Sequence, residues 1–191
     1  MNMPRTFIIA EVGVNHNGDL EMAHRLIDAA MDVGADAIKF QTAIPELVAT
    51  KFAQKAVYQK RSSGAMESQL EMIRRIHFPL DAYKGLKQYC DRKGIVFFSS
   101  AFDMESLAFL QQLGQPYHKV PSGEITNLPY LREIGRFGRP VILSTGMATM
   151  DEINAAIFLL EMEGLDRKKI TILHCNSEYP TPMQDVNLRA M

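Results

Sequence analysis

The stretch Tyr117-His-Lys-Val-Pro-Ser-Gly-Glu124 contains the pattern that decides the fold. It predicts a short strand over residues 117–120, followed by a tight turn that carries a hydroxyl and a carboxylate. Gly123 has no Cβ, so the backbone there can approach a ligand closely. Lys119 is suited to neutralise a phosphate or carboxylate, Ser122 to hydrogen-bond it, and Glu124 to hold a second substrate rich in hydroxyls. A solvated Lys–Glu pair on an ordinary loop is the alternative for this stretch alone.

The same pattern of a strand with a polar end recurs along the chain. Apolar strands are predicted over residues 7–10, 37–41, 95–98, 117–120, 140–143 and 170–173. Apolar residues at helical spacing, with capping residues before them and glycines after them, predict the helices between these strands. They are expected over residues 19–33, 67–76, 81–92, 103–113, 127–137 and 149–163.

This alternation predicts an α/β protein with a parallel sheet covered by helices. Two folds compete, an open doubly wound sheet and a (β/α)8 TIM barrel. No GxGxxG follows the first strand, and all six strands end in polar or charged residues, which favours the barrel. Six units are fewer than eight, so residues 1–191 are expected to be the incomplete N-terminal barrel of a longer protein. Residues 42–79 form an irregular insertion of the kind that often serves as a lid.

Composition narrows the class of protein further. The chain has 191 residues, of which 47% are hydrophobic and 23% charged, and this suits one globular domain. The formal net charge of −1 does not point to nucleic acid or a membrane surface. Cys90 and Cys175 form neither a CxxC pair nor a disulfide framework. With no signal peptide or membrane span in the sequence, a cytoplasmic protein is expected.

The strand ends together offer a set of groups that suits a small anionic substrate. The set comprises Lys39 and Lys119, the hydroxyls of Ser99, Ser100, Ser122, Ser144 and Thr145, and the carboxylates of Glu11 and Glu124. Cations and hydroxyls suit a phosphorylated, carboxylated molecule, and the carboxylates suit a polyol. The alternative for any one serine is that it satisfies backbone groups at a strand end. No GxSxG is present to suggest a hydrolase elbow.

Six motifs stand out in order along nearly the whole chain. They are Ile9-Ala-Glu-Val-Gly-Val-Asn-His-Asn-Gly18, Ile38-Lys-Phe-Gln-Thr42, Phe98-Ser-Ser-Ala-Phe-Asp103, Lys119-Val-Pro-Ser-Gly-Glu124, Ile142-Leu-Ser-Thr-Gly-Met147 and Leu173-His-Cys-Asn-Ser-Glu-Tyr-Pro-Thr-Pro182. Together they closely resemble the motifs of the sialic acid synthase family. Two departures stand out. Ser100-Ala101 replaces a common Thr-Pro, and Cys175-Asn176-Ser177 replaces Cys-Thr-Asn or Cys-Thr-Ser.

The resemblance implies a (β/α)8 barrel followed by a small antifreeze-protein-like domain beyond this chain, in a domain-swapped homodimer. It implies a transferase that condenses phosphoenolpyruvate with an open-chain sugar of the N-acetylmannosamine type and releases phosphate by C–O cleavage. Some stretches resemble the subgroup that makes legionaminate, among them residues 67–69, 102–106 and 121–130. That subgroup uses a 2,4-diacetamido-6-deoxy sugar.

The resemblance also assigns roles to individual residues. Its phosphoenolpyruvate contacts correspond to Lys39, Ser100, Lys119, Ser122 and Ser144, with Ser177 carried over more weakly. Its amino-sugar contacts correspond to Glu11, Glu124 and Tyr179, and Gln41 supports the cluster around the first lysine. It implies a divalent metal, Mn²⁺ or Mg²⁺, on two histidines beyond Met191, so no metal ligand is expected within this chain.

Two alternatives remain open from the residues themselves. One is a Schiff-base aldolase that uses Lys39 or Lys119 on a barrel strand. The other is that the chain by itself is an inactive barrel fragment or a binding module. His16, in the first loop, is suited equally to lining the sugar site and to a structural role.

Overall fold

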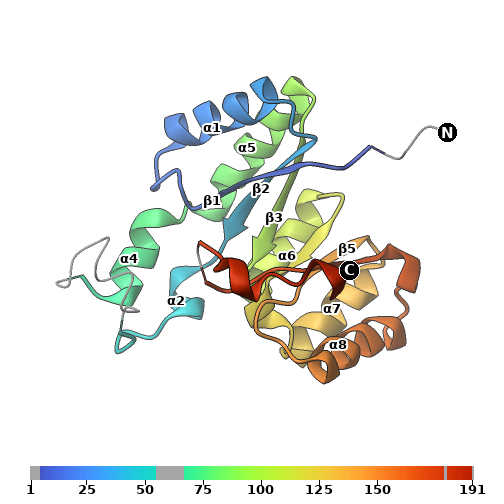
Figure 1. Ribbon diagram of the computed structural model, residues 1–191. Coiled ribbons are helices and arrows are strands. Elements are labelled where there is room, and N and C mark those ends of the chain that lie inside the picture. Colours follow the sequence, from blue (N-terminus) through green and yellow to red (C-terminus); the bar gives the residue numbers. More distant parts are fainter. Residues whose placement is uncertain (1–4, 55–66, 179, 191) are drawn as a thin grey trace. The chain divides into compact units, whose positions relative to one another are not determined.

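Parallel strands and helices alternate along the chain in the order that the sequence predicts (Figure 1). The structure is a computed structural model that describes residues 5–54, 67–178 and 180–190. It divides into two units, residues 1–114 and residues 115–191. None of the helices in the described ranges combines the length and the apolar character needed to cross a lipid bilayer.

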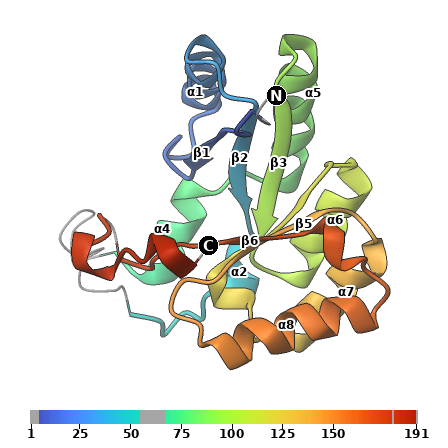
Figure 2. The same cartoon turned by 45° about the vertical axis from the view of Figure 1, so that its right-hand side comes forward.

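In the first unit, three strands pair in parallel in sequence order. The elements are β1 (Ile9–Gly13), α1 (Leu20–Asp32), β2 (Ala37–Thr42), α2 (Pro45–Val48), α4 (Gln69–Ile76), α5 (Leu80–Lys93), β3 (Val96–Ala101) and α6 (Met104–Leu113). Figure 2 shows β2 and β3 side by side with α1 and α5 near them. The helix–strand alternation predicted for this half of the chain is therefore confirmed.

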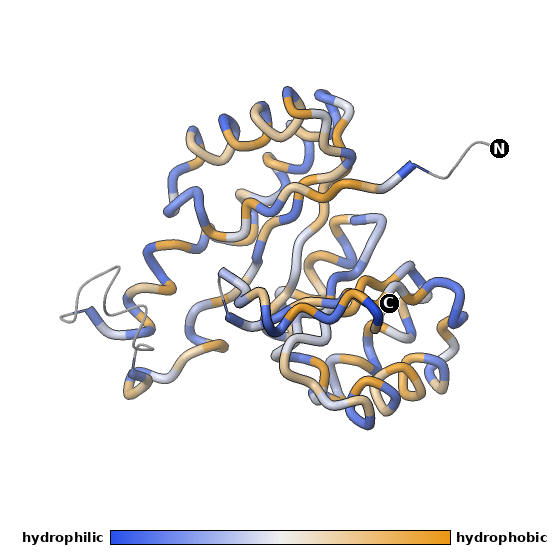
Figure 3. Tube along the Cα trace, viewed as in Figure 1, coloured by the Kyte–Doolittle hydropathy of each residue, from blue (hydrophilic) through white to orange (hydrophobic). Residues whose placement is uncertain are grey.

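The core of the first unit lies between the sheet and the helices that follow it. Ile27 of α1 and Leu86 of α5 pack in one cluster with Ile38 and Phe40 of β2 and Phe97 of β3. The apolar residues recur along α1 at helical spacing, which is visible as alternating colour in Figure 3. One face of each of these strands thus packs against the helices, and the side chains of the opposite face are available to form a site.

The first strand lies further along the chain than predicted. It begins at Ile9 and includes Glu11, whereas Phe7 and Ile8 are exposed. The reason is Asp36, whose carboxylate accepts a hydrogen bond of 2.8 Å from the Ile8 N–H. This side-chain contact takes the backbone donor that would otherwise extend the strand pairing.

Two further boundaries differ from the prediction. Asp81 does not cap α5, which begins at Leu80 with Pro79 in the capping position; Asp81 bonds Lys84 in the first turn instead. Strand β3 continues through Ser99 and Ser100, which therefore alternate across the sheet and do not both follow the strand.

The predicted insertion, residues 42–79, contains two helices among its described residues. They are α2 and α4, and α4 begins with a capping box in which Ser68 and Glu71 bond one another's backbone N–H groups. Residues 55–66 of this insertion lie outside the described residues. The suggested role as a lid stays a prediction.

The second unit repeats the same parallel arrangement. Its elements are β4 (His118–Val120), η1 (Ser122–Glu124), α7 (Leu128–Phe137), β5 (Val141–Ser144), α8 (Met150–Met162), η2 (Arg167–Lys169), β6 (Ile170–Leu173), η3 (Met183–Asp185) and η4 (Leu188–Ala190). Asn127 caps α7, and Thr149 forms the predicted capping box with Glu152 at the start of α8. Helices α7 and α8 lie side by side in Figures 1 and 2.

Candidate active site

The register of the first sheet places four of the predicted site residues on one face. Glu11 lies opposite Lys39, and Gln41 lies opposite Ser100. Lys39 and Gln41 are two residues apart on β2, so their side chains point to the same side of the sheet. The core residues that pack against the helices occupy the alternate positions. The four polar side chains therefore share the face that is turned away from the helices.

Glu11 and Lys39 form an ion pair on this face. The side chain of Lys39 is 12% exposed and that of Glu11 is 45% exposed, so the carboxylate is the accessible partner. Gly13 adopts a left-handed conformation with φ of 55°, and a Cβ there would lie 2.9 Å from Glu11 Oε1. Gly13 thus leaves the space that the Glu11 carboxylate occupies.

Residues on the helix-facing side of the sheet form hydrogen bonds that fix the end of β2. The Tyr83 hydroxyl donates a hydrogen bond of 2.7 Å to the Gln41 carbonyl, and burial raises the pKa of Tyr83 to about 12, which keeps it protonated. The hydroxyls of Thr42 and Ser99 bond each other at 2.7 Å. Ser99 therefore has the structural role that was the alternative for the serines, whereas Ser100 shares the face of Gln41.

In the second unit, Lys119 and Ser144 are brought together by the strand register. Lys119 lies opposite Ile142, and Ser144 is two residues further along β5 on the same face. The Lys119 ammonium donates hydrogen bonds of 2.6 Å to Ser144 Oγ and 2.9 Å to the Val120 carbonyl, and the residue is only 8% exposed. A nearly buried cation at a strand end is suited to a small anion.

Two more predicted serines converge on Gly146. A Cβ on Gly146 would lie 2.6 Å from Ser122 Oγ and 3.3 Å from Ser177 Oγ, and Gly146 has φ of 50°. Only glycine fits this close approach without strain. Ser122 and Ser177 also line a hollow of about 320 Å³, together with Gly123, Ile125, Thr126, Met147, Ala148 and Glu152. Asn176, one of the two departures from the family pattern, accepts from the Glu178 N–H at 2.8 Å and so stabilises the turn beside Ser177.

The thiol of Cys175 belongs to the same group and was not singled out from the sequence. Its sulfur accepts a hydrogen bond of 3.4 Å from the Gly146 N–H. Burial acts to raise the pKa of Cys175, but hydrogen bonds from Gly146, Ser144 and Thr145 outweigh it and lower the pKa below its usual value. The Thr145 hydroxyl itself donates to the Leu173 carbonyl at 2.9 Å, which joins the ends of β5 and β6.

Glu124 lies in the turn that follows Lys119. Its carboxylate accepts a hydrogen bond of 2.6 Å from the Asn127 side-chain amide, which orients it at the start of α7. Tyr179 lies outside the described residues. Of the ten predicted site residues, the structure places Glu11, Lys39, Gln41 and Ser100 on one face in the first unit. In the second unit it joins Lys119 to Ser144, brings Ser122 and Ser177 to Gly146, and pairs Glu124 with Asn127.

His16 packs inside the first unit, and its Nε2 is buried without a hydrogen-bond partner among the described residues, so the choice between a site role and a structural role stays open. It is fully buried, and its ring stacks on Phe78 with 4.0 Å between ring centroids. Its Nδ1 accepts a hydrogen bond of 3.1 Å from the Gly18 N–H. Burial, and next the nearby His77, lower the pKa of His16 to about 4, so the ring is neutral near pH 7.

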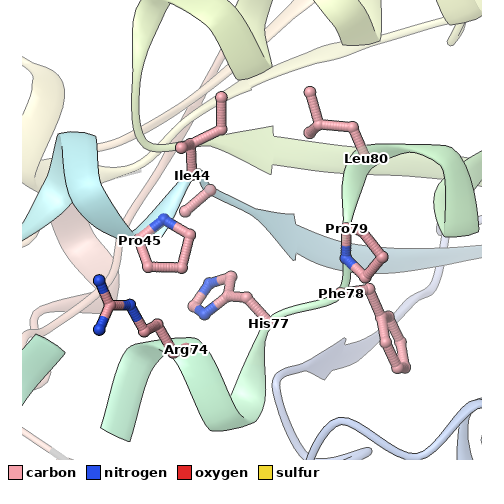
Figure 4. A pocket seen from close by; sticks show the side chains of 8 residues that line it. Ile44, Pro45, Arg74, His77, Phe78, Pro79 and Leu80 are labelled. Carbon is pink, nitrogen blue, oxygen red and sulfur yellow. The ribbon is translucent and has the colours of Figure 1, made fainter. Parts of the chain in front are cut away.

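A hollow of about 300 Å³ lies where β2 ends, between α2 and α4. It is lined by Ala43, Ile44, Pro45, Arg74, His77, Phe78, Pro79 and Leu80. In Figure 4 the side chains of Arg74 and His77 extend from the end of α4 toward Pro45. This hollow was not predicted, because its walls come from segments that the sequence separates by some thirty residues.

The described residues do not by themselves form a metal site. No group of three or more histidine, cysteine, aspartate or glutamate side chains lies close enough together to hold an ion within the described ranges. The Glu11 carboxylate, at the strand ends, is already paired with Lys39. The part of the chain described here therefore supplies no ligand set for the divalent ion that the resemblance implies.

Comparison with known proteins finds relatives that are named as synthases of sialic-acid-like sugars. The chain is 47% identical over 189 residues to an N,N'-diacetyllegionaminic acid synthase of Campylobacter jejuni, covering 99% of this chain and 57% of that protein. It is 42% identical to a protein of the same name from Legionella pneumophila, covering 97% of this chain and 52% of the relative. The chain thus spans about half the length of the curated relatives it matches.

Solved structures agree on the fold. The crystal structure of an N-acetylneuraminic acid synthetase from Leptospira borgpetersenii, in complex with citrate, matches with a TM-score of 0.82 and 33% identity. The match covers 98% of this chain and 60% of that one. These matches confirm the predicted α/β barrel class, and the described residues of this chain contribute six parallel strands, with an α-helix after each of the first five. Residues 26–191 match the model of the NeuB family, and the chain belongs to that family.

Proposed function

We propose that the protein condenses phosphoenolpyruvate with the open-chain form of an N-acylated amino sugar to give a nonulosonic acid and inorganic phosphate. The observation that carries this proposal is the nearly buried Lys119 ammonium bonded to Ser144, at the strand ends where Ser122 and Ser177 converge on Gly146. Cations and hydroxyl donors in this arrangement suit a phosphorylated carboxylic acid. Membership of the NeuB family and the names of the relatives support the same reaction.

The reaction begins with attack by C3 of phosphoenolpyruvate on the aldehyde carbon of the sugar. This step forms the new C–C bond, breaks the C=O π bond so that the aldehyde oxygen takes up a proton and becomes a hydroxyl, and leaves positive charge at C2. Water adds to C2 and loses a proton. The resulting intermediate loses phosphate through cleavage of the C2–O bond, and C2 becomes the keto carbon of the product. Lys119 supplies positive charge for the anionic phosphoenolpyruvate, and its hydrogen bonds to Ser144 and the Val120 carbonyl hold the ammonium in place, which lowers the cost of stabilising the developing phosphate charge. The resemblance gives Lys39 of the first unit the same task.

In this proposal the two carboxylates bind the sugar rather than phosphoenolpyruvate. Glu11 and Glu124 accept hydrogen bonds from hydroxyl groups of the sugar. Glu11 suits this role because its carboxylate is the exposed half of the ion pair with Lys39. Glu124 suits it because Asn127 already fixes one of its oxygens and leaves acceptor sites on the carboxylate.

For the sugar itself, we favour a 2,4-diacetamido-6-deoxy sugar over N-acetylmannosamine. The relatives named N,N'-diacetyllegionaminic acid synthase, at 47% and 42% identity, support this choice. A relative named N-acetylneuraminate-9-phosphate synthase, from Homo sapiens, is 36% identical. We further propose that the complete protein is a cytoplasmic homodimer that binds a divalent metal, with ligands outside the described residues.

The test is product analysis with the complete protein, phosphoenolpyruvate and each sugar. Phosphoenolpyruvate carrying ¹⁸O in the bridging C–O bond should give phosphate that retains the label, because the C–O bond breaks. Loss of the label, or no phosphate release with any amino sugar, would overturn the proposal. Borohydride treatment with substrate distinguishes the Schiff-base aldolase, since that enzyme would leave a reduced adduct on Lys39 or Lys119. Metal content of the purified protein tests the metal separately.

A further inference from the structure

The hollow at the end of β2 presents a hydrogen-bond acceptor in His77. The Nδ1–H of His77 donates to the Ile73 carbonyl at 3.1 Å, so in the neutral ring Nε2 carries the lone pair. Burial lowers the pKa of His77, which keeps the ring neutral at physiological pH. The hollow therefore offers an acceptor suited to an N–H group.

The same hollow presents a donor in Arg74. Its Nε–H donates to Glu46 Oε1 at 2.7 Å, which orients the guanidinium, and the terminal nitrogens carry the other four N–H bonds. Arg74 and His77 both line the hollow and extend in the same direction from the end of α4 (Figure 4). Arg74 and His77 thus bring a donor and an acceptor to the hollow.

The remaining walls are apolar. They comprise Ala43, Ile44, Pro45, Phe78, Pro79 and Leu80. An acceptor for N–H, a donor for C=O and an apolar surface for a methyl group are together the complement of an acetamido group. A phosphate or free carboxylate would leave the His77 acceptor facing a second acceptor, which costs the desolvation of both.

The hollow lies at the strand ends that carry the proposed sugar contact. Ala43, in its wall, follows Gln41 by two residues on the same strand end. Phe78, also in its wall, stacks on His16 in the loop that follows Glu11. The hollow thus lies at the carboxyl end of β2, the strand of Lys39, and through Phe78 it adjoins the loop that follows β1, the strand of Glu11.

We propose that this hollow is the subsite for an acetamido group of the sugar, with Arg74 donating to its carbonyl and His77 Nε2 accepting its N–H. The inference rests on the proposed function and deepens it. It identifies Arg74 and His77 as specificity-determining residues for acylated amino sugars.

The experiment compares substitutions in the complete protein across three sugars. They are the 2,4-diacetamido-6-deoxy sugar and two analogues, each with a hydroxyl in place of one acetamido group. His77→Asn keeps a donor to the Ile73 carbonyl but removes the acceptor at Nε2, and Arg74→Gln removes the guanidinium. Arg75→Gln is the matched control, because Arg75 lies on the same helix, pairs with Glu67 and does not line the hollow.

Each of the two test substitutions should raise the KM for the diacetamido sugar roughly three- to tenfold, the value of one hydrogen bond. The KM for phosphoenolpyruvate should not change. One analogue should be insensitive to both substitutions, because it already lacks the group that occupies the hollow. An unchanged sugar KM, equal effects on all three sugars, or the same effect from Arg75→Gln would overturn the inference while leaving the condensation intact. Failure of the wild-type protein to release phosphate with any of the sugars would instead overturn the proposed function, and the inference with it.

Discussion

Substitution of Gly146 by alanine tests whether the close approach of Ser122 and Ser177 forms the anion site. The added Cβ would lie 2.6 Å from both Cβ and Oγ of Ser122 and 3.3 Å from Ser177 Oγ. Contacts as short as 2.6 Å force one partner to move, and Ser122 cannot retreat as the end of a flexible side chain would, because its Cβ is one of the contacting atoms.

Gly146→Ala should have two separate effects, one on folding stability and one on the binding of phosphoenolpyruvate. An alanine with φ near 50° costs about 1 kcal/mol of folding stability through backbone strain. Displacement of Ser122 removes one hydrogen bond to a charged ligand, worth about 1.5–3 kcal/mol. This corresponds to a rise of about ten- to a hundredfold in the KM for phosphoenolpyruvate.

The matched control is Gly138→Ala. Gly138 has φ of 65°, but a Cβ there would meet nothing within 4 Å. Both variants should lose stability in urea unfolding through backbone strain, Gly146→Ala at least as much as Gly138→Ala because of its added clash, and only Gly146→Ala should change the steady-state KM for phosphoenolpyruvate. If the two variants show the same KM, or if Gly146→Ala affects only stability, Ser122 and Ser177 do not form the anion site.

Three further predictions concern the charged and titratable residues. Lys119→Met should raise the KM for phosphoenolpyruvate about ten- to a hundredfold with an unchanged circular dichroism spectrum, since it removes a charged donor; an unchanged KM would remove Lys119 from the site. Glu124→Gln keeps an acceptor for Asn127 but removes the charge, so the sugar KM should rise while calorimetric binding of phosphoenolpyruvate stays the same, and loss of both would indicate a structural role. Because burial lowers the pKa of His16 from 6.5 to about 4, the unfolded state binds more protons between these pH values, so stability should fall by at most about 3 kcal/mol as pH drops through this window. Urea unfolding should show a shallower fall for His16→Asn, and an unchanged slope would contradict this assignment.

The sequence predicted the order and type of the elements well because each unit carries its own local signals. Asn127 and the Thr149–Glu152 capping box begin the helices where they were expected, and Gly114 and Gly138 follow the last residues of α6 and α7. These signals act within a few residues, so the sequence alone reveals them.

The parts of the site that were not predicted depend on contacts between distant residues. The adjacent Ser99 and Ser100 looked equivalent, but strand β3 continues through both, so they point to opposite faces. The approach of Gly146 to Ser122 and Ser177 depends on the register of strands and loops far apart in the chain. The carboxylate of Asp36 sets the start of β1 in the same way, from beyond the first helix.

The insertion between β2 and α5 has a consequence for how freely this region can vary. Strands β1, β2 and β3 pair in order, but their connections differ in length. The connection from Ala37 to Val96 is about twice as long as the connection from Ile9 to Ala37. Doubling a loop adds only about 0.6 kcal/mol of closure entropy to the cost of folding. The longer connection between β2 and β3 therefore adds little to the entropic cost of folding. Length changes at the exposed positions of this connection should therefore change the free energy of unfolding little, whereas its buried residues Ala43, Met72, Ile73 and Phe78 are constrained by the packing of the core.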